Sequence, residues 1–175
     1  MSHWKDEKRW SDRFLPEIKR ILGEHLIGEP PVEEDAERNT DLMVLRLDAV
    51  RIGCRVRRYE QIAYCNEFTI RSKLASGKHT ELTKIIAGWG DYFFYGFSNQ
   101  YETKLCHWIL GDLKALRLYI NRQLYMKKQP WITEITNKDT NGRPTSFVVF
   151  RYANIDNPPF VIAQSENIYQ KEKSA

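Results

Sequence analysis

The sequence has few cysteines, and none of them stands at the spacing of a metal site. Cys54, Cys65 and Cys106 include no Cys-x-x-Cys pair, and the four histidines offer no partner at ligand spacing. We therefore expect no structural zinc. The three thiols are expected to be small, buried hydrophobic groups in a reducing compartment.

Membrane-spanning and secretory segments are also missing. No apolar run approaches the ~18 residues that a transmembrane helix requires. The N-terminus, Met1-Ser-His-Trp-Lys-Asp-Glu-Lys-Arg-Trp10, carries too much charge for a signal peptide. We expect a soluble, cytoplasmic protein with no membrane partner.

Common catalytic signatures are missing as well. The segment Gly88-Trp-Gly90 lacks the spacing and the lysine of a phosphate-binding loop, and no Gly-x-Ser-x-Gly occurs. Cys106 and His107 are adjacent, but neighbours on a helix point about 100° apart and form no dyad. Any enzymatic site must therefore be assembled from residues that lie apart in the sequence.

Apolar residues are abundant enough for a packed core. Of the 175 residues, 42% are hydrophobic and 13% aromatic, which suits one domain of this size. We predict a flexible arm over 1–13, a single globular domain over 14–163 and a polar tail over 164–175. The net charge of +4 permits nucleic-acid binding without requiring it.

Hydrophobic periodicity predicts a mixed α/β (α+β) fold, in which helices flank a central β-sheet. The strand pair nearest the C-terminus either extends this sheet or forms a separate flap. In chain order we expect a helix from Pro16 to about Ile27, two adjoining strands within 40–58, a strand at 67–72, a helix capped by Thr80, an aromatic central strand within 88–97, a helix over 102–126, and strands at 131–135 and 146–152.

One carboxylate falls at a position where it requires a partner. Asp112 lies inside the apolar stripe of the helix predicted over 102–126, and a carboxylate on a buried stripe must be paired. We expect an ion pair between Asp112 and either Arg55 or Arg57, both of which lie on one face of the strand that ends the 40–58 stretch.

The most cationic stretch of the chain lies between residues 49 and 80, where the only acids are Glu60 and Glu67. Such a stretch suits either a nucleic-acid backbone, because each neutralised phosphate releases counterions, or an internal network of ion pairs. The candidate phosphate-binding residues here are Arg51, Arg55, Arg57, Arg58, Arg71 and Lys73.

The order of elements, with an acid in Asn39-Thr40-Asp41-Leu42 at the start of an early strand, resembles the restriction-endonuclease-like, or PD-(D/E)XK, nuclease superfamily. The resemblance covers roughly residues 14–121 and implies a restriction-endonuclease-like core with an added strand pair. It also implies that Asp41 is a metal ligand and that Glu17 or Glu24 is the helix-borne glutamate of the site. The implied activity is hydrolysis of DNA assisted by Mg²⁺ or Mn²⁺.

The sequence departs from this family where an acid-x-lysine should follow on the next strand. Arg55-Val-Arg57 stands there instead. Arg57 could replace the lysine as a cation beside the scissile phosphate, but Arg55 cannot replace an acid as a metal ligand. Either another carboxylate (Glu67, Glu60 or Asp35) enters the site, or the chain is a relative without catalytic activity.

Three hypotheses therefore remain for the function. The first is a metal-dependent DNA nuclease with Asp41, Glu24 and Arg57 as catalytic residues, of which Asp41 and Glu24 hold the metal. The second is a catalytically inactive relative that binds nucleic acid or an enzyme acting on it. The third is a protein-interaction module with no nucleic-acid role. The small, compact chain would also suit a phage- or mobile-element-encoded protein.

Overall fold

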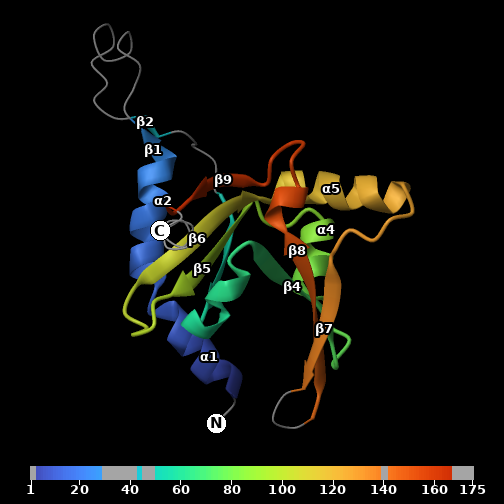
Figure 1. Cartoon of the computed structure of the whole chain (residues 1–175), viewed down its shortest axis with the longest axis horizontal. Helices are drawn as coiled ribbons and strands as arrows, with labels where there is room; N and C mark the ends of the chain where they lie inside the picture. Colours follow the sequence, from blue (N-terminus) through green and yellow to red (C-terminus); the bar gives the residue numbers. More distant parts are fainter. Residues whose placement is uncertain (1–2, 29–42, 45–49, 139–141, 167–175) are drawn as a thin grey trace, which may run out of the picture. The chain divides into compact units, whose positions relative to one another are not determined.

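The computed structural model (Figure 1) describes residues 3–28, 43–44, 50–138 and 142–166. The chain divides into two compact units, Ser2–Val50 and Arg51–Ala175. The single domain predicted over 14–163 stays a prediction. None of the described helices is long and apolar enough to cross a membrane.

The first unit is mainly helical. It contains α1 (His3–Asp12), α2 (Leu15–Leu26) and a short antiparallel pair of β1 (Ile27–Gly28) with β2 (Met43–Val44). The helix predicted from Pro16 to about Ile27 is confirmed as α2, and Phe14, Ile18 and Ile21 are buried at the helical spacing of one face.

The second unit begins with a mixed sheet, as predicted. Its strands are β3 (Ile52–Arg57), β5 (Tyr92–Ser98), β6 (Leu105–Asp112) and β9 (Val161–Gln164), in the order β3-β5-β6-β9. β3 pairs with β5 in parallel, and the other pairs are antiparallel.

A second, antiparallel sheet has the order β4-β8-β7, from β4 (Glu67–Leu74), β7 (Thr133–Lys138) and β8 (Pro144–Arg151). The C-terminal strand pair predicted from the sequence is therefore confirmed, and its partner is β4. The strands expected within 40–58 and at 67–72 were predicted as consecutive members of one central sheet, and this is wrong, because β3 and β4 belong to different sheets. β3 pairs with β5 and β4 pairs with β8, so each of them pairs with a strand more distant in the sequence and not with the other.

Short helices connect and cover these sheets (Figure 1). They are the 3₁₀ helices η1 (Tyr59–Tyr64) and η2 (Tyr152–Asn154), and the α-helices α4 (Glu81–Ile86) and α5 (Leu113–Tyr125). Thr80 caps α4, because its side chain accepts from the backbone of Thr83 while the Thr83 hydroxyl accepts from the backbone of Thr80.

Aromatic residues from both sheets fill one shared core. The ring of Phe68 on β4 stacks on Phe160 at 4.6 Å and on Phe150 at 5.3 Å between centroids. Phe93, on the central strand β5, lies 6.1 Å from the same ring. The aromatic run predicted as a central strand is thus part of the core, as expected.

The helix predicted over 102–126 is wrong in its first half. Residues Leu105–Asp112 form strand β6, and the helix begins only at Leu113. The Asp112 carboxylate caps this helix, since it accepts from the backbone nitrogens of Lys114 (2.6 Å) and Ala115 (3.4 Å). The expected ion pair with Arg55 or Arg57 is therefore wrong, because the helix terminus supplies the partners.

The cysteines are free, as expected, but they are not buried. Cys54 is exposed, while Cys65 and Cys106 are partly exposed. The expectation of three buried thiols is thus wrong, because the face of β3 that carries Cys54 does not belong to the shared core of the two sheets.

Candidate anion-binding site

The outer face of the second sheet is the face opposite the shared core. Side chains alternate along β4, so Phe68 and Ile70 enter the core while Glu67 and Arg71 lie on the other face and stay partly exposed. The hydroxyl of Thr69 lies 3.2 Å from that of the core residue Tyr95. The antiparallel register places Arg71 directly opposite Phe147 of β8. The two side chains are therefore cross-strand neighbours.

A second arginine reaches this face from the other sheet. The Arg55 guanidinium donates to the carbonyl oxygen of Thr69 at 2.7 Å and to its hydroxyl at 3.2 Å. It also donates to a carboxylate oxygen of Glu81 at 2.5 Å, in a pair whose side chains are only 15% and 30% exposed. Because Thr80 caps α4, Glu81 is fixed in its first turn, where the helix dipole favours a carboxylate.

Arg71 has a different environment from Arg55. Its guanidinium carbon and that of Arg55 each lie 5.6 Å from the ring centre of Phe147. The Nε of Arg71 is buried and makes no hydrogen bond in the part of the chain that the structure describes. Only its backbone nitrogen reaches Glu81, at 3.1 Å.

The cluster formed by Arg55, Arg71, Glu81 and Phe147 carries a net positive charge. Burial lowers the pKa of Arg71, and the charge of Arg55 lowers it further, while Glu81 raises it. Two guanidiniums thus share one carboxylate. Arg71 remains charged, because an arginine pKa starts far above neutrality. The site therefore favours an added anion, and planar guanidiniums match the oxygens of phosphate or carboxylate.

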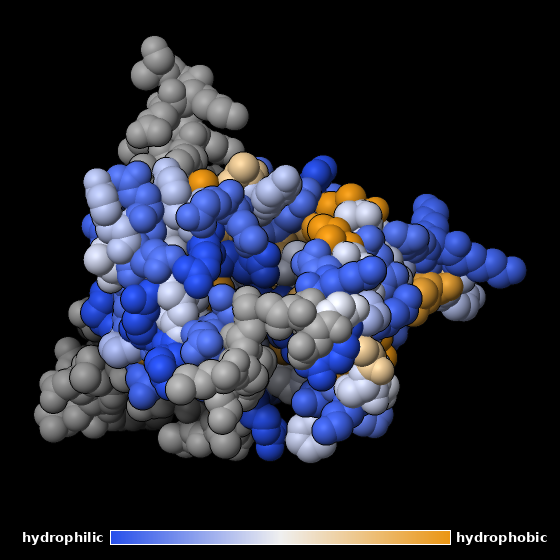
Figure 2. All heavy atoms as spheres, turned by 90° about the horizontal axis from the view of Figure 1, so that it is seen from below, coloured by the Kyte–Doolittle hydropathy of each residue, from blue (hydrophilic) through white to orange (hydrophobic). Residues whose placement is uncertain are grey.

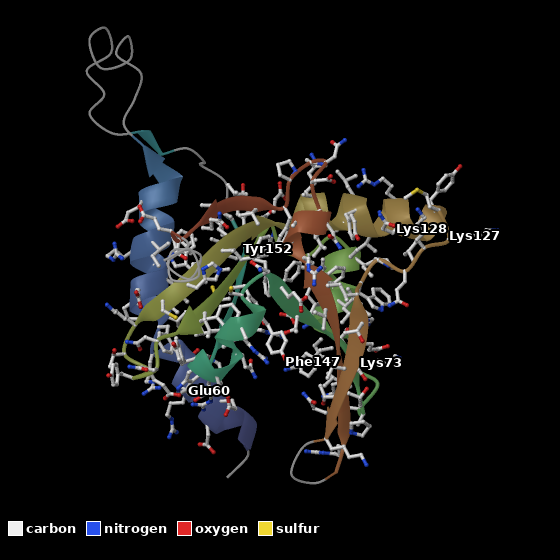
Figure 3. The ribbon with its side chains drawn as sticks, in the orientation of Figure 1. Glu60, Lys73, Lys127, Lys128, Phe147 and Tyr152 are labelled. Carbon is white, nitrogen blue, oxygen red and sulfur yellow. The ribbon has the colours of Figure 1, made fainter. Side chains whose placement is uncertain are left out.

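The other predicted phosphate-binding residues lie apart or already have partners. Lys73, labelled in Figure 3, pairs with Glu134 at 3.3 Å. Arg57 donates to the side chain of Gln61, and Arg58 pairs with Glu102. Arg51 is exposed, and its backbone nitrogen donates to Asp91 at 2.9 Å. The structure therefore brings together only Arg55 and Arg71 of the six predicted cations.

The predicted catalytic and metal residues are not assembled by the described part of the chain. Asp41 lies outside the described residues. Glu24 is exposed and pairs with Arg20 within helix α2. Of the carboxylates considered as replacements, Glu67 pairs with Arg151 at 2.9 Å and Glu60 is exposed.

No group of three or more His, Cys, Asp or Glu among the described residues could hold a metal ion. These residues by themselves do not fit Mg²⁺ or Mn²⁺. The predicted metal pair of Asp41 and Glu24 stays a prediction.

Sequence reasoning missed two members of the cluster, Glu81 and Phe147. Thr80 followed by Glu81 was a visible helix-start signal, and it placed the carboxylate in a first turn. Nothing local indicated that this turn would lie beside Arg55, or that Phe147 would face Arg71.

Comparison of the chain with protein-family models, with curated proteins and with solved structures finds no match.

Proposed function

We propose that the chain binds nucleic acid by accepting a backbone phosphate at Arg71, with Arg55 as the neighbouring cation. The observation that carries this proposal is the Arg71 guanidinium. Its Nε is buried without a hydrogen-bond acceptor among the described residues, and it shares one carboxylate with a second guanidinium. A phosphate beside this guanidinium would supply the missing negative charge, which the single carboxylate of Glu81 does not.

The surroundings of Arg71 support a phosphodiester over a compact inorganic anion. Phe147 lies beside both guanidiniums and remains partly exposed, so an aromatic surface adjoins the charge. Nucleic-acid-binding proteins combine these two features, since cations hold the backbone and aromatic rings contact the bases. The net charge of +4 adds long-range attraction to a polyanion.

The surface composition favours a polar partner. On the face drawn in Figure 2 the described side chains are mainly hydrophilic, and hydrophobic ones form small separate patches. Stable protein–protein interfaces have an apolar centre. A protein-interaction module therefore has less support on this face than a nucleic-acid ligand.

Metal-dependent DNA hydrolysis is a second candidate, and one observation favours it. β3, which carries Arg57, pairs in parallel with β5 through a connection that contains α4. The parallel pair and its helix-containing crossover are features of the core that the PD-(D/E)XK resemblance implies, whereas β4, which lies in the same connection, belongs to the other sheet. This candidate depends on Asp41 and Glu24 as ligands of Mg²⁺ or Mn²⁺.

The test compares the salt dependence of DNA binding for the unmodified chain, Arg71→Met and Arg122→Met. Arg122 is a matched control, because it lies on α5, is 43% exposed and forms a salt bridge among the described residues only with Asp156, at 3.9 Å. We expect Arg71→Met to weaken binding and to flatten the dependence on salt, while Arg122→Met leaves both near their original values. Equal effects of the two substitutions would contradict the assigned site.

The second candidate requires its own assay. Cleavage of single-stranded, branched and linear duplex DNA is measured with Mg²⁺, Mn²⁺ or EDTA, for the unmodified chain and for Asp41→Asn. Metal-dependent cleavage that is lost in Asp41→Asn would establish hydrolysis. Salt-dependent binding without cleavage would support the binding function and contradict hydrolysis.

A further inference from the structure

A pocket of about 570 Å³ opens at one end of the second sheet. Its lining includes Tyr64, Asn66, Glu67, Arg151, Tyr152 and Gln164, which come from the ends of η1, β4, β8, η2 and β9. This volume is of the size that small organic ligands occupy in proteins. All of these residues belong to the unit Arg51–Ala175.

The charges in the pocket cancel. Arg151 and Glu67 form an ion pair at 2.9 Å across the β4–β8 ladder, where they are directly opposed. The remaining polar side chains are neutral. Burial raises the pKa of the Tyr152 hydroxyl, so it stays protonated at neutral pH and donates to the Asn66 amide oxygen at 2.9 Å. The pocket therefore suits a neutral polar ligand better than an anion.

The neutral groups offer stacking and hydrogen bonding together. Tyr64 is 64% exposed, and Tyr152 is a second aromatic side chain of the lining (Figure 3). No described residue hydrogen-bonds to the Gln164 carboxamide, which carries a donor and an acceptor. Aromatic rings with carboxamide edges are the groups that recognise unpaired nucleobases, by stacking and by pairing with base edges.

We propose that this pocket receives an unpaired nucleobase of a single-stranded nucleic acid. This inference rests on the proposed function, because it adds a base site to the phosphate site at Arg71. A duplex keeps its bases inside the stack, and a base can enter a pocket only after it leaves the stack. The preferred ligand is therefore single-stranded.

The geometry of the second sheet connects the two sites. Glu67 and Arg71 lie on the same face of β4, four residues apart. At about 3.3 Å per residue, this separation is about 13 Å along the strand. A stacked nucleic-acid strand rises about 3.4 Å per nucleotide, so about four nucleotides or fewer span the distance. One strand can thus place a phosphate at Arg71 and a base in the pocket.

The test uses the full chain and single-stranded DNA oligonucleotides of about 12 nucleotides, either with bases or abasic throughout. We expect the unmodified chain to bind the abasic oligonucleotide about tenfold more weakly, since stacking and base-edge contacts are lost. Tyr64→Ala and Gln164→Leu should weaken binding of the base-containing oligonucleotide and leave the abasic one unchanged. Tyr101→Ala is the matched control, because Tyr101 is 74% exposed and lies outside the pocket lining.

The outcomes separate this inference from the proposed function. Equal affinity of the unmodified chain for both oligonucleotides, or equal losses on both from Tyr64→Ala, would overturn the base pocket while leaving the phosphate site. If neither oligonucleotide binds, the proposed function fails. Nucleosides, which lack phosphate, then test the pocket alone. Nucleoside binding, measured by calorimetry, that is lost in both Tyr64→Ala and Gln164→Leu would support the pocket, and the absence of nucleoside binding would overturn it.

Discussion

Arg71→Met should weaken nucleic-acid binding without weakening the fold. The substitution removes the charge and the hydrogen-bond donors of Arg71 but keeps an unbranched apolar side chain beside Phe147. The substitution should not cost stability, because burial and the charge of Arg55 already act against the Arg71 cation.

The two expected magnitudes follow from different interactions. A hydrogen bond to a charged group contributes about 1.5–3 kcal/mol, so losing the phosphate contact should weaken binding about 10- to 100-fold. The slope of log affinity against log salt should fall by about 0.7–0.9, the amount for one phosphate. The free energy of unfolding should stay within about 0.5 kcal/mol or rise slightly, as when an unfavourably placed buried charge is replaced by an apolar group.

Both quantities are measurable on the same preparations. Fluorescence anisotropy with a labelled oligonucleotide at several salt concentrations gives the slope, and urea unfolding gives the free energy. The reasoning would be refuted by an unchanged salt slope together with a loss of stability above about 1 kcal/mol, the size of an average destabilising substitution. Arg71 would then be a structural residue whose charge the fold requires.

Three further predictions concern stability. Glu81→Gln leaves the guanidinium of Arg55, which is 15% exposed, without its carboxylate and should lower the free energy of unfolding by about 2 kcal/mol in urea unfolding. The control Glu134→Gln, whose partner lysine is 73% exposed, should change it by less than about 0.5 kcal/mol in the same titration. Gly111→Ala would place a Cβ 2.1 Å from the fully buried ring of Phe160. It should lower the free energy of unfolding by about 3 kcal/mol in chemical denaturation, and an unchanged free energy would contradict this packing. Burial lowers the pKa of His107, an effect that the backbone of Cys65 partly offsets. The unfolded chain therefore takes up the proton first, and stability that is fully present above about pH 6.5 should be lost as the pH falls below that value. His107→Gln should reduce the dependence of the free energy of unfolding on pH, measured by urea unfolding at several pH values. If the dependence is unchanged, His107 is not its cause.

Elements whose pattern is local could be predicted from the sequence. β3 and β4 alternate in polarity, and α2 carries an apolar arc that begins near a proline and ends near a glycine. These signals depend on neighbours within one element, so they survive without knowledge of the fold. The α+β class of the fold also followed from the helical and strand periodicities.

β6 could not be recognised in this way, because both of its faces are largely buried. Leu105, Ile109 and Leu113 recur every fourth residue and thus imitate a helical stripe. In the structure Leu105 and Ile109 are buried in a strand, where intervening residues such as His107 and Leu110 are buried as well. A doubly covered strand has no alternation to detect. The available signal was Asp112, whose side chain suits a helix start and marks where the strand ends.

The candidate site could be predicted only as a list of cations. Composition located Arg55 and Arg71 in the basic stretch, but it could not assign their partners. Glu81 meets Arg55 across 26 residues, and Phe147 meets Arg71 across the β4–β8 ladder. Such long-range pairing decides which cation is neutralised and which keeps its charge. Arg55 is held by Glu81, and Arg71 is left to bind an anion, which is why the functional residue emerges from the register of two strands and not from the count of arginines.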